Sequence, residues 1–131
     1  MMNKYDLEVR VRYSETDQMG VVYYANYMVW FEMVRTEFFR NNGMSYRDLE
    51  KKDKIFLPVV EVSCKYKIPL KYDDKITVAA KLVEMGVSRI VFEYEIRRGD
   101  KLTTTGVTKH VFINEKGLPV RVPAKVRSKF Q

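Results

Sequence analysis

Apolar and polar residues alternate near the start of the chain and again through most of its second half. Between positions 4 and 13 this alternation predicts a half-buried strand, because successive side chains of a strand point to opposite faces. The apolar face of that strand comprises Leu7, Val9, Val11 and Tyr13. The same period predicts further strands at about 56–68, 75–85, 88–98 and 101–114. Their connections are short, which favours antiparallel neighbours.

Between the first strand and the others, the period lengthens to three and four residues. From about Tyr23 this spacing predicts one long helix, which the sequence Asn-Asn-Gly at 41–43 ends. Its first half, 27–31, is apolar nearly all round, which is typical of a helix enclosed by protein on most sides. A helix-start pattern predicts a short second helix from Ser45 to about Lys52. We therefore expect an α+β fold in which a strongly bent antiparallel sheet surrounds the long helix.

Length and composition favour a single domain over residues 1–131. The chain is 46% hydrophobic and 13% aromatic, enough apolar material for a core without disulfides. Its one cysteine, Cys64, cannot form an internal disulfide, which fits a reducing compartment. The N-terminus has no signal-peptide pattern, and the most apolar stretch, 21–31, is far shorter than the ~20 residues of a membrane span. These features predict a cytoplasmic protein without membrane association.

The chain carries 24 Lys and Arg residues against 17 Asp and Glu residues, a formal net charge of +7. This excess favours an anionic partner such as nucleic acid, a membrane surface or a phosphorylated cofactor. The basic residues are spread along strand-like segments, with some concentration at 121–129, and they alternate with apolar residues as on a solvated strand face. Nucleic-acid binding is therefore a minor interpretation and is not expected.

Several familiar catalytic patterns are absent from the sequence. It has no glycine-rich phosphate loop, no Gly-x-Ser-x-Gly, no His-Glu-x-x-His and no paired cysteines, so metal chemistry is not expected. The unusual segment is 10–27, where Asp17 lies in a polar loop, Gly20 follows, and an apolar helix begins. Free backbone N–H groups at a helix start can hold an oxyanion while a carboxylate attacks or activates water, and acyl transfer needs both functions. Each piece taken alone also fits a turn or a core helix.

The run TDQMGVVYYANY at 16–27, preceded by Arg10-Val11, resembles the active-site signature of the 4-hydroxybenzoyl-CoA thioesterase family of hotdog-fold proteins, in particular the YbgC-like acyl-CoA thioesterases. A second block, PVVE at 58–61, is similar to the next strand of that family. It is followed in the expected order by Tyr66, Pro69-Leu70 and Asp74. Two separated blocks in the right order make the resemblance specific, and it covers about 5–114.

The resemblance implies a hotdog fold, a homodimer that joins two sheets and often assembles into tetramers, and an active site at the dimer interface. It implies an acyl-CoA thioesterase in which Asp17 is the nucleophile or general base and a backbone N–H near Tyr24 polarises the carbonyl. Coenzyme A is then part of the substrate and no separate cofactor is expected; an acyl-carrier protein is a second candidate partner. Arg89 and Lys65 would contact the phosphates of coenzyme A. The expected substrate-binding residues are Gly20, Val21, Tyr23, Asn26, Tyr27, Val60, Lys65, Ser88 and Arg89.

One residue departs from the pattern. YbgC-like members commonly carry a histidine between Tyr23 and Ala25, where this chain has Tyr24. A tyrosine hydroxyl donates a hydrogen bond but is a poor base near neutral pH. If the family histidine orients water, turnover here is slower or the substrate range differs. The backbone N–H at this position is retained.

Other interpretations remain open. The alternative to the enzyme is a non-catalytic hotdog module that binds acyl-CoA or an acyl-carrier protein. A hotdog dehydratase or isomerase would be expected to carry an active-site histidine, and His110, the only one in the chain, is far from Asp17 in sequence. We expect His110 to pack on a strand face or lie at the surface. A Cys64–His110 nucleophile is a further minor hypothesis, because a lone cysteine in a strand is usually a small apolar residue.

Overall fold

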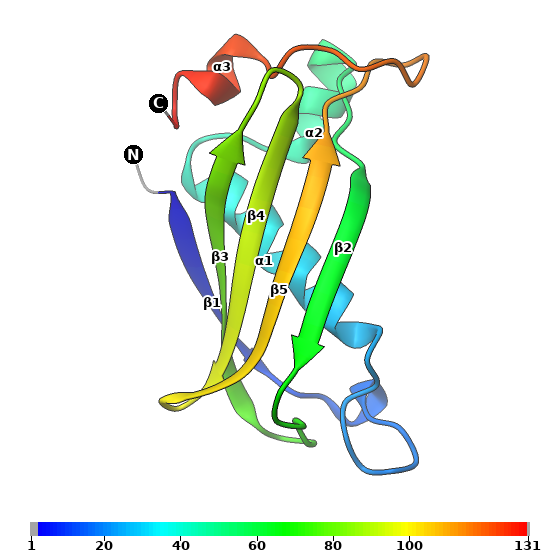
Figure 1. Ribbon diagram of the computed structural model, residues 1–131, viewed down its shortest axis with the longest axis vertical. Helices are drawn as coiled ribbons and strands as arrows, with labels where there is room; N and C mark the ends of the chain where they lie inside the picture. Colours follow the sequence, from blue (N-terminus) through cyan, green and yellow to red (C-terminus); the bar gives the residue numbers. More distant parts are fainter. Residues whose placement is uncertain (1–2, 131) are drawn as a thin grey trace.

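Five antiparallel strands form one sheet in the order β1-β3-β4-β5-β2 in the computed structural model, which describes residues 3–130 (Figure 1). The strands are β1 (Lys4–Arg10), β2 (Val59–Tyr66), β3 (Lys75–Met85), β4 (Arg89–Arg98) and β5 (Lys101–Val111). The helices are α1 (Asn26–Asn41), α2 (Tyr46–Asp48) and α3 (Ala124–Arg127), with a 3₁₀ turn at Tyr13–Glu15 and a π-helical turn at Leu49–Asp53. The predicted α+β class and antiparallel neighbours are confirmed.

The first strand is shorter than its alternation predicts. β1 ends at Arg10, and Tyr13, assigned above to the buried face, begins the 3₁₀ turn and is 77% exposed. The Glu15 carboxylate accepts a hydrogen bond from the Arg12 N–H at 2.7 Å, so that N–H is bound locally and cannot join a strand ladder. The prediction for Tyr13 is therefore wrong.

The central strands follow their predicted alternation closely. The inward side chains of β3 and β4 are almost fully buried beneath α1, and they are Ile76, Val78, Ala80, Leu82, Ile90, Phe92, Tyr94 and Ile96. On β5 the inward position Gly106 leaves room for a ring, because a Cβ there would lie 2.6 Å from the Phe31 side chain. Phe31 in turn stacks on Tyr94 with ring centroids 4.3 Å apart. The bent sheet is thus packed tightly against one helix.

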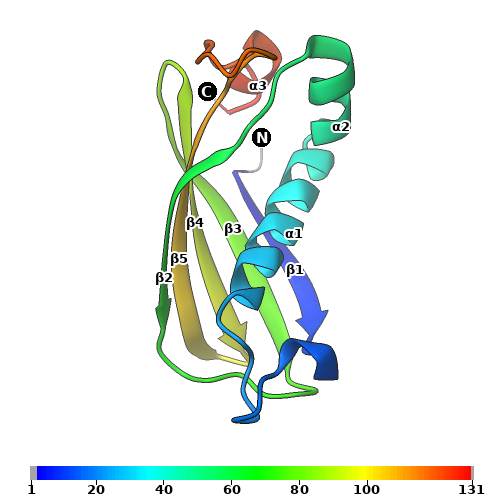
Figure 2. The same cartoon turned by 90° about the vertical axis from the view of Figure 1, so that its right-hand side faces the viewer.

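Helix α1 lies along one face of the sheet, and among the described residues no helix covers the opposite face (Figure 2). The helix begins at Asn26, three residues later than predicted, and it ends at Asn41 as predicted. Its buried side chains include Trp30, Val34 and Phe38, each 0% exposed. The three- and four-residue period of the sequence therefore identified the buried stripe of the helix.

The expectation that α1 is enclosed on most sides is not met within this chain. Val29 is 49% exposed and Met33 is 38% exposed. The backbone of α1 lies closest to β1 and β3, and the edge strand β2 is left uncovered, with exposed apolar residues along its length. These are Val59, Val60, Val62 and Tyr66, each at least 45% exposed. An edge of this kind can pair with another strand.

The remaining segments differ from the predictions mainly at their ends. The Ser45 hydroxyl accepts a hydrogen bond from the Asp48 N–H, as the helix-start pattern predicted, and the π-helical turn extends α2 to Asp53. β2 and β5 are shorter than expected, because 57–58, 67–68, 112 and 114 lie outside the strands and Phe56 and Ile113 pair only as an isolated bridge. Helix α3 was not predicted. Within residues 3–130, no helix has the length and apolar character needed to cross a membrane.

Candidate active site

Asp17 lies in a tight loop at the end of the sheet where β3 begins. Its backbone N–H donates to the Val21 carbonyl at 2.9 Å, and its carboxylate Oδ1 accepts the Met19 N–H at 2.9 Å. Gly20 closes this loop with φ +81°, a conformation that residues with a Cβ rarely adopt. Within the described chain, the second carboxylate oxygen of Asp17 accepts no hydrogen bond from protein. Asp17 therefore presents an oxygen that is available to a substrate or to water.

The segment between this loop and α1 leaves two amides without partners. The Tyr23 N–H donates to the Glu15 carbonyl at 2.9 Å, and the Asn26 N–H donates to the Tyr23 carbonyl at 2.9 Å. Between them, the N–H groups of Tyr24 and Ala25 donate no hydrogen bond to any described residue. Unpaired amides at the start of a helix carry partial positive charge and can stabilise a developing oxyanion.

Two tyrosines cover this helix start. The rings of Tyr23 and Tyr24 lie with centroids 4.8 Å apart, and both are substantially exposed. The pKa of Tyr23 is raised, first by the neighbouring Tyr24 hydroxyl and more weakly by the Asp17 carboxylate. From β2, the Tyr66 hydroxyl donates to the Tyr24 carbonyl at 3.3 Å. This hydrogen bond joins strand β2 to the start of α1.

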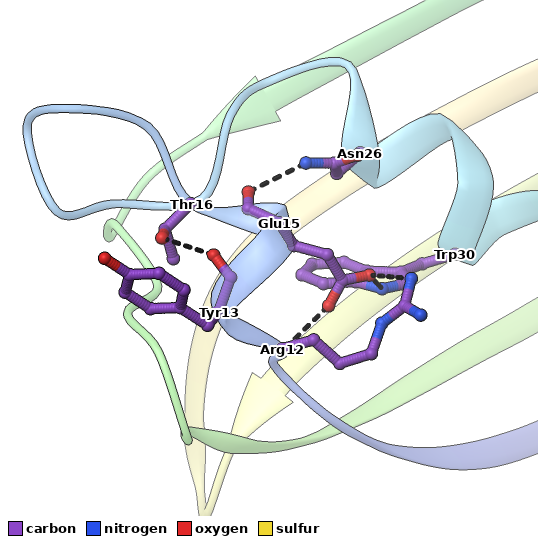
Figure 3. Close-up of polar contacts among 6 residues, drawn as sticks. All are labelled: Arg12, Tyr13, Glu15, Thr16, Asn26 and Trp30. Carbon is purple, nitrogen blue, oxygen red and sulfur yellow. Dashed lines mark hydrogen bonds and ion pairs between the residues drawn. The ribbon is translucent and has the colours of Figure 1, made fainter.

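Glu15 is the residue of this region that sequence reasoning missed (Figure 3). Its side chain is buried and accepts the Trp30 indole N–H at 3.1 Å as well as the Arg12 N–H. Its carbonyl accepts the Asn26 side-chain amide at 2.7 Å. A glutamate in a polar loop carries no sequence signal of burial, and the helical spacing of Trp30 indicated only a core position.

An open cavity of about 540 Å³ adjoins Asp17. Tyr13 and Tyr72 form part of its wall, with ring centroids 5.7 Å apart and planes at 85°. Its other lining residues are Thr16, Asp17, Gln18 and Gly20. The alternation of the first strand had assigned Tyr13 to the buried face. Because Tyr13 is exposed instead, its ring forms part of the wall of this cavity.

The structure brings some of the expected binding residues to Asp17 and separates others. Gly20, Val21, Tyr23 and Asn26 share its loop and helix start, whereas Tyr27 is 2% exposed, with its ring against Trp30 and Tyr66. The amide of Asn26 is already bonded to Glu15, as described above. Val60 lies exposed on β2. Lys65 precedes Tyr66 on β2 and lines an open groove on the opposite face of the sheet, beside Lys81 and Glu93.

Ser88 and Arg89 lie at the other end of the sheet. Ser88 directly precedes β4, and Arg89 is its first residue. The last residue of β4, Arg98, lies at the end of the sheet that adjoins the Asp17 region. At a rise of about 3.3 Å per residue, β4 separates them from Asp17 by about 30 Å. The family resemblance assigns Arg89 to the phosphates of coenzyme A, and within one chain those phosphates would have to lie about 30 Å from Asp17.

The Cys64–His110 hypothesis finds no support in the geometry. Cys64 is opposite Gly106 on β5, whereas His110 is opposite Val59, about 15 Å away along the strands. Partial burial raises the pKa of the Cys64 thiol, which weakens it as a nucleophile. His110 is 0% exposed, in agreement with the expected packing role. No group of three or more His, Cys, Asp or Glu residues in the described chain is arranged to hold a metal ion.

The site therefore combines an available carboxylate with unpaired helix-start amides, the two groups that acyl transfer needs. Known proteins share the fold of this chain. A DHNA-CoA thioesterase from Staphylococcus aureus is 36% identical and superposes with a TM-score of 0.86 over 92% of this chain and 81% of that chain. A mutant 4-hydroxybenzoyl-CoA thioesterase in complex with 4-hydroxybenzoyl-CoA superposes with a TM-score of 0.91 over 99% of this chain and 100% of that chain, and at 21% identity it shows the fold alone.

Sequence relatives agree with these structures. The acyl-CoA thioesterase YbgC of Haemophilus influenzae is 30% identical over 129 residues, which are 98% of this chain and 95% of that protein. The matches confirm the hotdog fold and the resemblance to thioesterases that the two sequence blocks indicated. Residues 11–130 match the model of the thioesterase-like superfamily, and the chain therefore belongs to this superfamily of thioester-hydrolysing enzymes.

Proposed function

We propose that this protein is an acyl-CoA thioesterase that releases free coenzyme A and a carboxylic acid, with Asp17 at the centre of the reaction. The observation that carries this proposal is a free Asp17 carboxylate oxygen in the loop that leads directly to the unpaired amides of Tyr24 and Ala25 at the start of α1. Membership of the thioesterase-like superfamily and the similarity to YbgC support the substrate class. A thioester is already an activated acyl group, so a carboxylate and an oxyanion site suffice without a histidine.

Two routes use these groups. In the first, an Asp17 oxygen attacks the thioester carbon, the C–S bond breaks to release the thiolate of coenzyme A, and water hydrolyses the resulting mixed anhydride. In the second, Asp17 takes a proton from a water molecule as that water attacks the same carbon; the C–S bond then breaks, and Asp17 gives the proton to the sulfur, which leaves as the thiol of coenzyme A. In both, the oxygen of the tetrahedral intermediate lies against the Tyr24 N–H, so the backbone of Tyr24, rather than its hydroxyl, is the catalytic group.

A second copy of the chain completes the binding site in this proposal. The exposed apolar edge of β2 is suited to antiparallel pairing with the same edge of a partner, as in the predicted dimer. In such a pair, each strand of one sheet runs opposite to the same strand of the other sheet. Arg89 of the partner subunit therefore lies toward the end of the sheet that carries Asp17 in the first subunit. Arg89 of the partner subunit can then contact the phosphates of a coenzyme A molecule whose thioester lies at Asp17.

The first experiment measures thiol release from aliphatic and aromatic acyl-CoA thioesters and from acyl-carrier protein thioesters. We expect Asp17→Asn to lower kcat by about a thousand-fold or more while the unfolding midpoint and oligomeric state stay unchanged. Tyr24→Phe, the matched control, should change kcat by less than about threefold, because it keeps the backbone N–H.

The outcomes separate the alternatives. Near-normal turnover in Asp17→Asn would contradict the role of the carboxylate. Tight acyl-CoA binding by the wild-type protein without thiol release would instead identify the non-catalytic module. Sedimentation of the wild-type protein as a monomer would contradict the shared site.

A further inference from the structure

Glu15 is a buried carboxylate in the segment that carries Asp17. The residue is 5% exposed, and its one ion-pair partner among the described residues, Arg12, has a side chain that is 73% exposed and lies 3.5 Å away. A buried carboxylate is costly unless hydrogen bonds replace its hydration. Here the replacements are two neutral donors, the Arg12 backbone N–H at 2.7 Å and the Trp30 indole at 3.1 Å. Such an arrangement is an expensive way to stabilise a loop.

The main chain of Glu15 makes two further connections. Its carbonyl accepts the Tyr23 N–H at 2.9 Å and the Asn26 side-chain amide at 2.7 Å. Figure 3 shows the side chain of Glu15 between Arg12 and Trp30, with its carbonyl turned to Asn26 at the start of α1. One residue therefore ties the end of the β1 segment to the helix and to the residue that precedes Tyr24.

We propose that Glu15 is a positioning residue, which sets where the Asp17 carboxylate lies relative to the Tyr24 amide; the inference rests on the proposed function. Asp17 follows Glu15 by two residues, and the Tyr24 amide follows Tyr23, whose own N–H is bonded to the Glu15 carbonyl. Asp17 is thus connected to Glu15 by two residues of chain, and the Tyr24 amide is connected to it by one residue and one hydrogen bond. A displacement of about 1 Å between reacting groups is enough to reduce a rate by about a hundredfold.

The test substitutes Glu15 while preserving its size. Glu15→Gln places an NH₂ group against one of the two donors, so one of these bonds is lost and the loop shifts. We expect kcat to fall by about 30-fold or more and KM to change by less than about threefold, because the group acts on alignment rather than on substrate contact. Glu15→Asp keeps the charge but is too short to reach both donors, and it should also lose kcat.

A double variant tests whether Glu15 acts through the helix. Trp30→Phe removes the indole donor and keeps an aromatic ring. If both residues belong to one clamp, Glu15→Gln combined with Trp30→Phe loses no more kcat than the more damaging of the two single variants. Strictly multiplicative losses would contradict the clamp.

A matched control separates positioning from stability. Val78→Ala removes a 0% exposed side chain in the middle of β3, outside the site, and should lower the unfolding midpoint with little change in kcat. Amide exchange gives a readout that needs no substrate: Glu15→Gln should speed exchange at 16–25 by more than about tenfold and leave β3 and β4 unchanged. Val78→Ala should affect the strands instead.

The kinetic and exchange measurements separate failure of the positioning role from failure of the proposed function. A wild-type protein that releases no thiol would contradict the proposed function, while exchange at 16–25 would still show whether Glu15 fixes the loop. Normal kcat in Glu15→Gln, or unchanged exchange in that segment, would overturn the positioning role.

Discussion

Two buried charges in this protein are stabilised in opposite ways. Glu15, at the Asp17 end, is an anion held by N–H donors. Arg35, within α1, is a 7% exposed cation held by hydroxyl acceptors: Nε donates to Tyr46 and Nη1 to Tyr94, each at 3.0 Å. No carboxylate of the described chain forms an ion pair with Arg35. Burial is the main cause that raises the pKa of both tyrosines, so their hydroxyls stay neutral acceptors.

The two networks differ in reach. The contacts of Glu15 stay within the 12–30 segment, so they order a loop. The network of Arg35 crosses the sheet: the Tyr94 hydroxyl lies 2.6 Å from that of Thr108, which lies 2.7 Å from His110 Nε2. It therefore joins α1, β4 and β5. We infer that substitutions in the first network mainly lower kcat, whereas substitutions in the second mainly lower the free energy of unfolding of the whole fold.

The largest effect we expect on the second network comes from acid. Burial is the main cause that lowers the pKa of His110 to about 4, and the Arg35 charge lowers it further. The unfolded chain, with an ordinary histidine pKa of about 6.5, binds this proton more readily than the folded chain. The resulting stability is therefore complete above about pH 6.5 and decreases toward pH 4, by about 3 kcal/mol. Urea unfolding at several pH values measures it.

His110→Gln is the control for that measurement. Glutamine can still bond to Thr108 but does not titrate, so the stability of the variant should depend less on pH over the same range. Equal pH dependence in the two proteins would show that His110 is not the titrating group. The Nδ1 of His110 makes no hydrogen bond within the described chain, although the carbonyls of Leu57 and Pro58 lie near enough to raise its pKa slightly.

Removing one hydroxyl from the network should have the next largest effect. Tyr94→Phe keeps the stacking on Phe31 but takes one acceptor from the buried Arg35. Hydrogen bonds to charged groups contribute about 1.5–3 kcal/mol, so we expect a loss of about 2 kcal/mol at neutral pH. The kcat should not change, in contrast with Glu15→Gln. A fall in kcat at temperatures where the variant is folded would show that the Arg35 network also affects the reaction, and it would contradict the distinction between the two networks.

A smaller loss is expected at the middle of the chain of hydroxyls. Thr108→Val conserves shape and removes the group between Tyr94 and His110. It leaves His110 without its bond at Nε2, so we expect the free energy of unfolding to drop by about 1–2 kcal/mol. If the loss in Tyr94→Phe and Thr108→Val combined equals the sum of the two, the hydroxyls are independent rather than one network.

The smallest effect concerns the first network. The ion pair between Arg12 and Glu15 is long, and the arginine is mostly solvent-exposed. Arg12→Ala keeps the backbone N–H that Glu15 binds, and it should cost less than about 0.5 kcal/mol. Salt titration of unfolding provides the check. A loss several times larger would mean that the guanidinium, rather than neutral donors, stabilises the carboxylate.

Much of the fold could be predicted because alternation and helical spacing report which side of an element faces the core. β3 was predicted to the residue, and β4 and the end of α1 to within one residue. The errors lie where a side-chain hydrogen bond overrides the hydrophobic pattern. Tyr13 fits the apolar alternation of β1, but the Glu15 side chain captures the preceding N–H and turns the chain outward.

The candidate site was predicted in part. The sequence placed Asp17, Gly20 and the helix start in one segment, because they are neighbours along the chain. The relation of Ser88 and Arg89 to that segment was not predictable, because the hairpin geometry puts them at the opposite end of the sheet. Glu15 was missed for a related reason: its burial depends on Trp30, which follows fifteen residues later.

The sequence by itself determined the elements, the apolar stripe of α1 and the segment that carries the candidate chemistry, since each depends on residues only a few positions apart. Tertiary structure alone decided which charges are buried, which amides remain free and which strand edge is open. Those properties depend on the solvent access and partners of each group, and both are set only when distant segments pack together.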